Sequence, residues 1–241
     1  MSAPRSLLFN LAFFGWTALA LAVCTPALAL PPLATVRAQR VWARGVLALM
    51  RWIVGIRVEI RGAAPAAGAL IAAKHQSAWD TLIWHIIVRD PAVVMKKELL
   101  AIPLYGWYCR KSRQIAVDRA GGPAALKAMV RAAQAAVEEG RPVIIFPEGT
   151  RTAPGQTLPY QPGVAALYRG LGVAVVPVAV NSGLYWPRRS FRKRPGTLVL
   201  EFLAPIAPGL KRGPFMAELE RRIESGTAAL VAEGRHSPSC G

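Results

Sequence analysis

A long uncharged segment opens the chain. No charged residue occurs between Arg5 and Arg37, and the stretch begins with a dense apolar run. A helix over residues 7–25 would reach roughly 28 Å, close to the ~30 Å hydrocarbon core of a bilayer. Three prolines would end that helix: Pro26, Pro31 and Pro32. The pattern predicts a membrane-associated helix that either spans the bilayer or lies in one leaflet.

A cleavable signal peptide is the competing interpretation, supported by Arg5 and by the small-residue pattern Ala27-Leu28-Ala29. Against it, the denser positive flank follows the apolar run, and by the positive-inside rule such a flank stays in the cytoplasm. We therefore expect a protein of the cell (inner) membrane whose main domain lies on the cytoplasmic side.

The positive flank has a helical spacing. Its arginines, which would share one face of a helix, are Arg37, Arg40, Arg44 and Arg51. Apolar residues such as Val46 and Met50 occupy the other faces, which is typical of a helix at a membrane surface. A helix packed on its own domain would show the same pattern. Residues 1–56 are accordingly predicted to be an N-terminal membrane anchor.

Apolar runs typical of β-strands alternate with helical patterns over the rest of the chain. The predicted strands cover residues 69–73, 93–95, 114–117, 143–146, 173–180 and 197–202. The predicted helices cover residues 123–139, closed by Gly140, and residues 164–170. This alternation predicts an α/β catalytic domain over residues 57–233, with a mostly parallel sheet flanked by helices. Residues 234–241 are predicted to be a loose tail.

Composition narrows the class of partner. The 30 Lys+Arg against 13 Asp+Glu give a formal charge of +17, which attracts anions, and the 53% hydrophobic content favours a membrane surface over nucleic acid. The cysteines Cys24, Cys109 and Cys240 lie far apart, and no H-E-x-x-H motif is present. We expect no metal ion and a reducing compartment.

One polar segment, residues 74–80, directly follows a predicted buried strand. Ser77 and Asp80 form an S-x-x-D capping box, so a helix is expected to begin at Ser77, and Asp80 could serve only as a cap. A carboxylate beside His75 would also fix its tautomer, so that the other ring nitrogen can accept a proton from a hydroxyl group. If the acceptor's own hydroxyl is the nucleophile, no catalytic serine is required.

Further polar groups follow the other predicted strands. In the segment Phe-Pro-Glu-Gly-Thr-Arg at residues 146–151, Gly149 allows close backbone approach and Arg151 offers a planar fork that matches phosphate oxygens. Arg119 and Lys96 add cations after two more strands. Each of these alone would be ordinary surface. Their shared position at strand ends, where parallel sheets build their sites, predicts a site for an anion.

These segments resemble the four sequence blocks of the glycerolipid acyltransferase family in their order and spacing. The matching segments are His75-x-x-x-x-Asp80, KKELLAIPLYGW at 96–107, IAVDR at 115–119, FPEGTR at 146–151 and VVPVAV at 175–180. The similarity covers about residues 69–180. It is greatest to the bacterial members that act on 1-acyl-sn-glycerol 3-phosphate.

The resemblance implies a general base at His75, with Asp80 as its partner. It further implies that glycerol phosphate is bound by Glu148, Gly149, Thr150 and Arg151, with help from Arg119 and from Lys96 in preference to Lys97. Pro177 would shape the acyl-chain side. The implied acyl donor is acyl-CoA or acyl carrier protein, with no cofactor.

The implied acceptor is lysophosphatidic acid, which would be converted to phosphatidic acid. Acylation of glycerol 3-phosphate, of lyso-ornithine lipid or of another lysophospholipid stays open. So does a different class, a basic peripheral membrane or nucleic-acid-binding protein in which His75 is structural.

Overall fold

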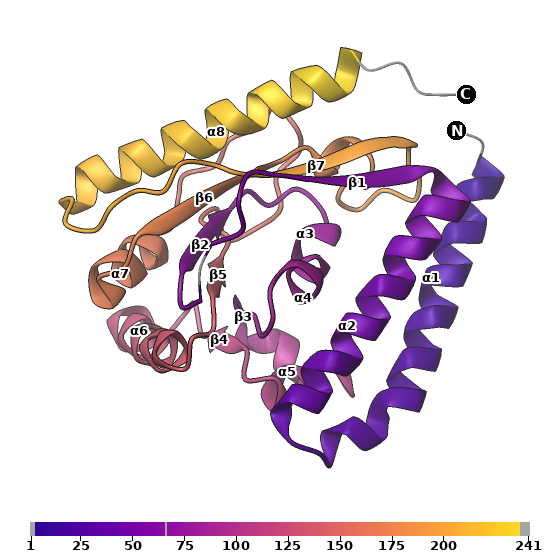
Figure 1. The fold of residues 1–241 in the computed structure, drawn as a ribbon, viewed down its shortest axis with the longest axis horizontal. Helices are drawn as coiled ribbons and strands as arrows, with labels where there is room; N and C mark the ends of the chain where they lie inside the picture. Colours follow the sequence, from indigo (N-terminus) through magenta and orange to yellow (C-terminus); the bar gives the residue numbers. More distant parts are fainter. Residues whose placement is uncertain (1–2, 66, 237–241) are drawn as a thin grey trace.

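A seven-stranded sheet forms the centre of the protein, in the order β1-β7-β6-β2-β5-β3-β4 (Figure 1). The computed structural model describes residues 3–65 and 67–236. The strands are β1 (Ile56–Arg61), β2 (Leu70–Ala73), β3 (Ala92–Lys96), β4 (Ile115–Val117), β5 (Val143–Ile145), β6 (Val175–Val180) and β7 (Gly196–Phe202). Neighbouring strands pair in parallel except β6 with β7, so the predicted mostly parallel sheet is confirmed.

Eight α-helices among the described residues surround the sheet. They are α1 (Ala3–Cys24), α2 (Pro32–Leu49), α3 (Trp79–Leu82), α4 (Trp84–Ile87), α5 (Tyr105–Lys111), α6 (Gly122–Glu138), α7 (Pro162–Leu171) and α8 (Arg212–His236). Short helical turns lie at η1 (Thr25–Leu28), η2 (Met50–Val54), η3 (Lys97–Ala101) and η4 (Ser182–Leu184). The predicted loose tail is wrong at residues 234–236, because α8 continues to His236; the remaining residues 237–241 lie outside the described part of the chain.

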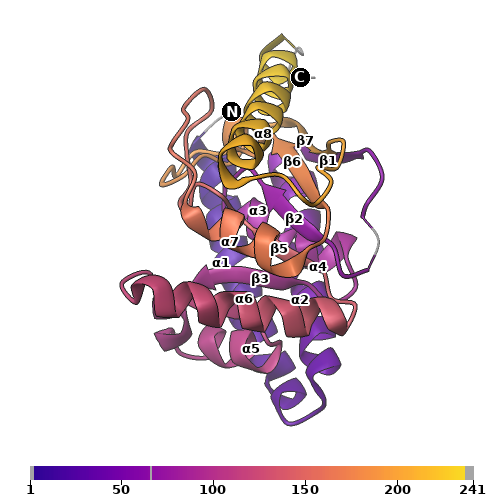
Figure 2. The ribbon, with the colours of Figure 1, turned by 90° about the vertical axis from the view of Figure 1, so that its left-hand side faces the viewer.

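Each face of the sheet has its own hydrophobic core, because successive residues of a strand point to opposite faces. In β2, Ile71 and Ala73 belong to the core on the side of the N-terminal helices, whereas Leu70 and Ala72 belong to the core under α6, α7 and α8. Figure 1 shows α1 and α2 on one side of the sheet and α6 and α7 on the other. Seen from that second side, α6 and α7 lie in front of the strands (Figure 2).

The first two helices pack side by side as a hairpin (Figure 1). One helical stretch among the described residues, Ala3–Leu28, is long and apolar enough to cross a membrane by its length and composition. The hairpin is nevertheless part of the domain's core, since Phe9, Val46 and Met50 are fully buried in the same cluster as Trp84. The described residues 3–56 therefore pack on the rest of the domain, and their predicted role as a membrane anchor stays a prediction.

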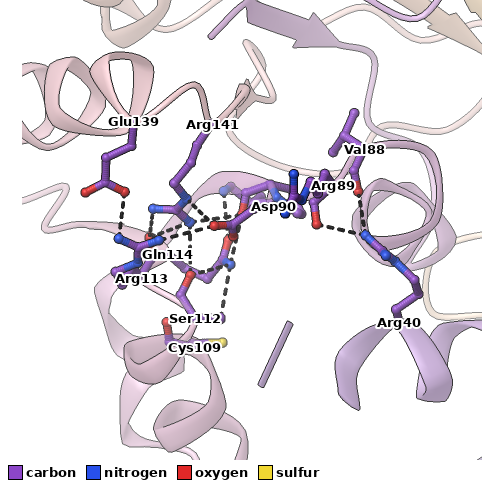
Figure 3. A network of polar contacts seen from close by, with 12 residues as sticks. Arg40, Val88, Arg89, Asp90, Cys109, Ser112, Arg113, Gln114, Glu139 and Arg141 are labelled. Carbon is purple, nitrogen blue, oxygen red and sulfur yellow. Dashed lines mark hydrogen bonds and ion pairs between the residues drawn. The ribbon is translucent and has the colours of Figure 1, made fainter. Parts of the chain in front are cut away.

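The arginines of α2 do not form a single surface that faces lipid. The guanidinium of Arg40 donates hydrogen bonds to the carbonyls of His85 (2.8 Å), Val88 (3.2 Å) and Arg89 (2.8 Å), as Figure 3 shows for the last two. The last carbonyl groups of a helix lack hydrogen-bond donors within the helix, and Arg40 supplies donors to those at the end of α4 and just after it. Arg37 and the rest of the stripe are exposed. The prediction of a single lipid-facing stripe is wrong at Arg40, where the alternative of packing on the domain holds.

A second polar network lies at the opposite ends of the strands from the site described below (Figure 3). Asp90, just before β3, pairs with Arg141 Nε at 3.1 Å and with Arg113 Nη2 at 3.2 Å. Arg113 also pairs with Glu139 at the end of α6. This network ties the end of α6 to the residues just before β3, β4 and β5.

Candidate active site

The carboxyl ends of β2, β3, β4 and β5 meet at one edge of the sheet because these strands are parallel. A cavity of about 1100 Å³ opens there. The predicted site residues that line it are His75, Lys96, Arg119, Gly149, Thr150 and Arg151. The other two, Asp80 and Glu148, are buried and do not line it.

His75 and Asp80 are in contact, with Nδ1 of the imidazole 3.0 Å from Oδ2 of the carboxylate. The same oxygen accepts the backbone N–H groups of Gln76 (2.6 Å) and Ser77 (2.7 Å). The helix begins at Trp79 rather than at Ser77, and the Ser77 hydroxyl accepts the N–H of Trp79, so the capping box is only half formed. Asp80 is thus both the clamp of this turn and the partner of the histidine.

The imidazole of His75 also stacks on Phe146, with 4.2 Å between ring centroids and 24° between the planes. Because Nδ1 faces Asp80 and the ring lines the cavity, Nε2 is the nitrogen available to a bound molecule. Ser77 is fully buried and its hydroxyl is engaged with the helix, so it is not placed to act as a nucleophile. The geometry suits a general base that acts on a hydroxyl supplied by the substrate.

Cations gather at one end of the cavity. The Arg119 guanidinium donates to the carbonyl of Gly149, whose φ of +67° favours glycine. A Cβ at that position would lie 3.3 Å from Nη2 of Arg119, a tight contact that would displace the guanidinium by a few tenths of an ångström. Burial lowers the pKa of Arg151, and the positive charges of Arg188 and Arg189 lower it further. A bound anion would relieve this mutual repulsion, so the arrangement suits a phosphate group.

Arg188 is a site residue that the sequence analysis did not find. It lines the cavity, and its Nη1 donates to the carbonyl of Arg151 at 2.9 Å. The only sequence signal for it is the basic run of residues 188–194, and such a run is usually a solvated loop.

Glu148 does not face the cavity, so its predicted contact with glycerol phosphate is not what the structure shows. Its carboxylate lies 2.6 Å from Lys74 Nζ, accepts the hydroxyl of Thr152 (2.9 Å) and accepts the backbone N–H of His75 (3.1 Å). Burial raises the pKa of Glu148, against the opposing charge of Lys74. A buried carboxylate with these partners holds the backbone of the histidine in place and would repel a phosphate.

Lys74 is the centre of this buried cluster. Its side chain is 1% exposed, and Nζ also lies 2.7 Å from the carboxylate of Glu224 on α8, which in turn accepts the hydroxyl of Tyr160 at 2.9 Å. Through Lys74 and Glu148, the last helix supports the catalytic turn. Neither Lys74 nor Glu224 was expected in this role.

Two further expectations can be compared with the structure. Pro177 does not line the cavity, because it lies inside β6 opposite Ala72, where its carbonyl accepts the N–H of Leu203. Its role on the acyl-chain side stays a prediction. Lys97 pairs with Asp118 at 3.3 Å and also does not line the cavity, which agrees with the preference for Lys96.

The other end of the cavity is apolar. It runs between the hairpin, α4 and α5, with walls that include Leu21, Trp42, Leu82, Leu99, Ile102 and Tyr108. Burial raises the pKa of the Cys109 thiol to about 11, so this group stays an uncharged thiol. Burial also lowers the pKa of His85 to about 4, which keeps the imidazole neutral at pH 7. A neutral, water-excluding wall of this kind suits a hydrocarbon chain.

Metal-ligand geometry is not seen in the described part of the chain: no three or more His, Cys, Asp or Glu side chains there are grouped to hold an ion. The expected lack of a metal stays a prediction. Cys240, the third cysteine of the chain, lies outside the described residues.

The sheet is mostly parallel, and one cavity at its edge holds His75, a group of cations and an apolar wall. These are the parts of a transferase that activates the hydroxyl of an amphiphilic anion. The comparison with family models narrows this class, because the model described as Acyltransferase matches residues 55–181. The chain belongs to that family and is an acyltransferase.

Individual relatives agree with this placement. A 1-acyl-sn-glycerol-3-phosphate acyltransferase of Pseudomonas aeruginosa is 36% identical over 195 residues, which cover 80% of this chain and 76% of the relative. The alpha form of this enzyme from Homo sapiens is 31% identical over 207 residues, covering 82% and 71%. The crystal structure of the 1-acyl-sn-glycerophosphate (LPA) acyltransferase of Thermotoga maritima superposes with a TM-score of 0.78 at 22% identity, covering 96% of this chain and 98% of that one, which shows the shared fold.

Proposed function

We propose that the protein transfers a fatty acyl group from acyl-CoA or acyl carrier protein to the sn-2 hydroxyl of 1-acyl-glycerol 3-phosphate, forming phosphatidic acid. The observation that carries this proposal is that His75 lines one cavity together with the cations Arg119, Arg151 and Arg188 and with the apolar residues of the hairpin and α5. A lysophosphatidic acid has the matching groups, with its free hydroxyl between a phosphate and an acyl chain. The names of the relatives support the same acceptor.

The reaction follows from the His–Asp geometry. His75 Nε2 accepts the proton of the acceptor hydroxyl while its oxygen attacks the thioester carbonyl, so a C–O bond forms and the C–S bond breaks. The proton then passes from the imidazolium to the leaving thiolate. Asp80 stabilises the imidazolium in between through the 3.0 Å contact with Nδ1. Arg151 and Arg119 hold the phosphate at the cationic end, with Arg188 beside them.

The membrane provides both the acceptor and the product, and α1 is the element suited to meet it. Large apolar side chains exposed along α1 are Leu7, Leu8, Leu11, Phe14, Leu19 and Val23. Since α2 returns beside α1 and packs on the domain, α1 suits insertion into the leaflet next to the domain rather than a full crossing. Together with the basic flank, this supports attachment to the cytoplasmic face of the cell membrane.

The proposal is tested by thiol release from one acyl-CoA and, in parallel, from the same acyl chain on acyl carrier protein. The protein is held in neutral detergent micelles and offered a panel of acceptors. Lysophosphatidic acid is expected to give the highest kcat/KM, above glycerol 3-phosphate, lyso-ornithine lipid and lysophosphatidylcholine. His75→Ala should lower the rate of release by ~10²–10⁴, whereas His236→Ala, on the exposed end of α8, should not change it. A higher kcat/KM for another acceptor would reassign the substrate. No release with any acceptor, from either donor, would favour a basic binding protein.

A further inference from the structure

A basic loop follows η4, and we use this name for residues 187–194. It contains five cations and no acidic residue, in the order Pro-Arg-Arg-Ser-Phe-Arg-Lys-Arg. Arg192 and Arg194 are exposed, and neither side chain has an ion pair with any residue of the described ranges 3–65 and 67–236. No ion pair within the described residues therefore explains why these two arginines are present in the loop.

The basic loop is fixed to the beginning of α1. Asn10 Nδ2 donates to the carbonyl of Phe191 at 3.1 Å, and the backbone N–H of Lys193 donates to the Ser6 hydroxyl at 3.1 Å. The Lys193 side chain is buried against Phe9, and its Nζ donates to the carbonyl of Phe191 at 3.1 Å. Burial lowers the pKa of Lys193. The protein thus buries one lysine to hold the other cations of the loop at this end of the helix.

Phe191 adds an apolar component to the same surface. The residue is 51% exposed, although its carbonyl accepts hydrogen bonds from both Asn10 and Lys193. The adjoining turns of α1 expose Leu7 and Leu11. Cations, an exposed aromatic ring and exposed leucines side by side are the combination that binds the headgroup and upper acyl region of an anionic bilayer.

We infer that the basic loop is a docking surface for anionic phospholipid headgroups, which complements the insertion of α1. This inference rests on the membrane attachment made under the proposed function. An acidic carrier protein would also match the charge, but the exposed Phe191 and the leucines of α1 favour a lipid surface. Because Arg188 at the start of the loop lines the catalytic cavity, the surface places the headgroup layer beside the phosphate end of the site.

The test is a competition between two vesicle populations of different density, one of phosphatidylcholine and one of phosphatidylcholine with phosphatidylglycerol at 3:1. Neither contains lysophosphatidic or phosphatidic acid, so the catalytic site does not contribute. Insertion of α1 is common to both populations and cancels in the ratio. The full-length protein is expected to prefer the anionic vesicles, and R192Q/R194Q should reduce this preference by up to ~25-fold, at roughly fivefold per cation. About 0.5 M NaCl should have the same effect.

The matched control is R131Q/R169Q, which removes the same charge from exposed positions on α6 and α7, across the sheet from α1 (Figure 1). This control should keep the preference. An unchanged ratio in R192Q/R194Q, or an equal loss in both variants, would overturn the inference. If the KM for acyl carrier protein rises in R192Q/R194Q while the vesicle ratio stays unchanged, the loop binds the acyl donor and not a lipid surface. Thiol release in neutral detergent should be unaffected by R192Q/R194Q, so failure of the catalytic proposal is seen separately.

Discussion

Lys74→Met removes the cation that lies between two carboxylates beside the catalytic turn. The side chains of Lys74 and Glu148 are 1% and 0% exposed, and the third member, Glu224, is 18% exposed. Deleting one partner of a buried ion pair usually costs about 3–5 kcal/mol, because the remaining charge loses its compensation. In this cluster the methionine would leave two carboxylates facing each other, so we expect a loss of unfolding free energy in that range.

Glu224→Gln is the matched variant. The amide oxygen can still accept hydrogen bonds from Tyr160 and Lys74, and one cation then faces one carboxylate. The expected cost is about 1 kcal/mol, the usual net contribution of a hydrogen bond. Denaturation in guanidinium, followed by tryptophan fluorescence, should therefore separate the two variants by at least ~2 kcal/mol. Equal losses, or a larger loss for Glu224→Gln, would refute the assignment of Lys74 as the centre of the cluster.

Kinetics give the second half of this test. Glu148 accepts the backbone N–H of His75 and does not line the cavity. Glu148→Gln should therefore lower kcat, because the backbone of His75 is held less firmly. The KM of the acceptor should stay within about twofold, because the variant removes no contact with the bound acceptor. A large rise in acceptor KM with unchanged kcat would restore Glu148 as a phosphate ligand.

His75→Ala should lower kcat by ~10²–10⁴. Asp80→Asn should also remove most of the activity. Its unfolding free energy should change by less than ~1 kcal/mol, because the amide oxygen can still accept the backbone N–H groups of the turn. Arg151→Ala should raise the KM of the acceptor more than that of the donor, and Arg151→Lys should recover only part, in steady-state assays with each substrate varied. His85 is neutral and buried, so its contribution is present above pH ~6.5 and is lost as pH falls towards 4, by up to ~3 kcal/mol; thermal unfolding of His85→Leu should lack this loss. Deleting residues 1–56 should give an aggregating domain in size-exclusion chromatography, not a soluble active one.

The strands of the site were predictable because each is a short apolar run followed by polar residues. The runs at 143–146 and 69–73 correspond to β5 and β2 within one residue. β1 is missing from the prediction, although Ile56, Val58 and Ile60 alternate with charged residues, because an edge strand that pairs only with β7 is half exposed and reads as surface.

The last helix had a usable signal that was not recognised. Its buried residues repeat at helical spacing: Phe215, Leu219, Ile223, Thr227, Leu230 and Val231. Charged residues such as Glu218 and Arg221 fill the remaining faces, which hides the stripe in a segment of low average hydrophobicity. The contact between Lys74 and Glu224 could not be predicted at all, because 150 positions separate them and only the folded sheet brings α8, which packs on β6 and β7, beside the residue that follows β2.

The hairpin shows most clearly what periodicity can and cannot establish. Helical spacing correctly places Arg40 with the other arginines of α2 on one side, but it does not say what lies opposite. In the structure, the groups opposite Arg40 are the backbone carbonyls of His85, Val88 and Arg89, so Arg40 holds α2 on the domain. The apolar face of α2 is likewise buried, with Val46 and Met50 at 0% exposure. Both faces of α2 are thus partly used in packing on the domain, while the exposed leucines of α1, together with Leu33 and Val41 of α2, form a hydrophobic surface available to a bilayer. Because the same hairpin walls the apolar end of the cavity, whatever seats α1 in lipid also brings the chain-binding end of the site to the membrane.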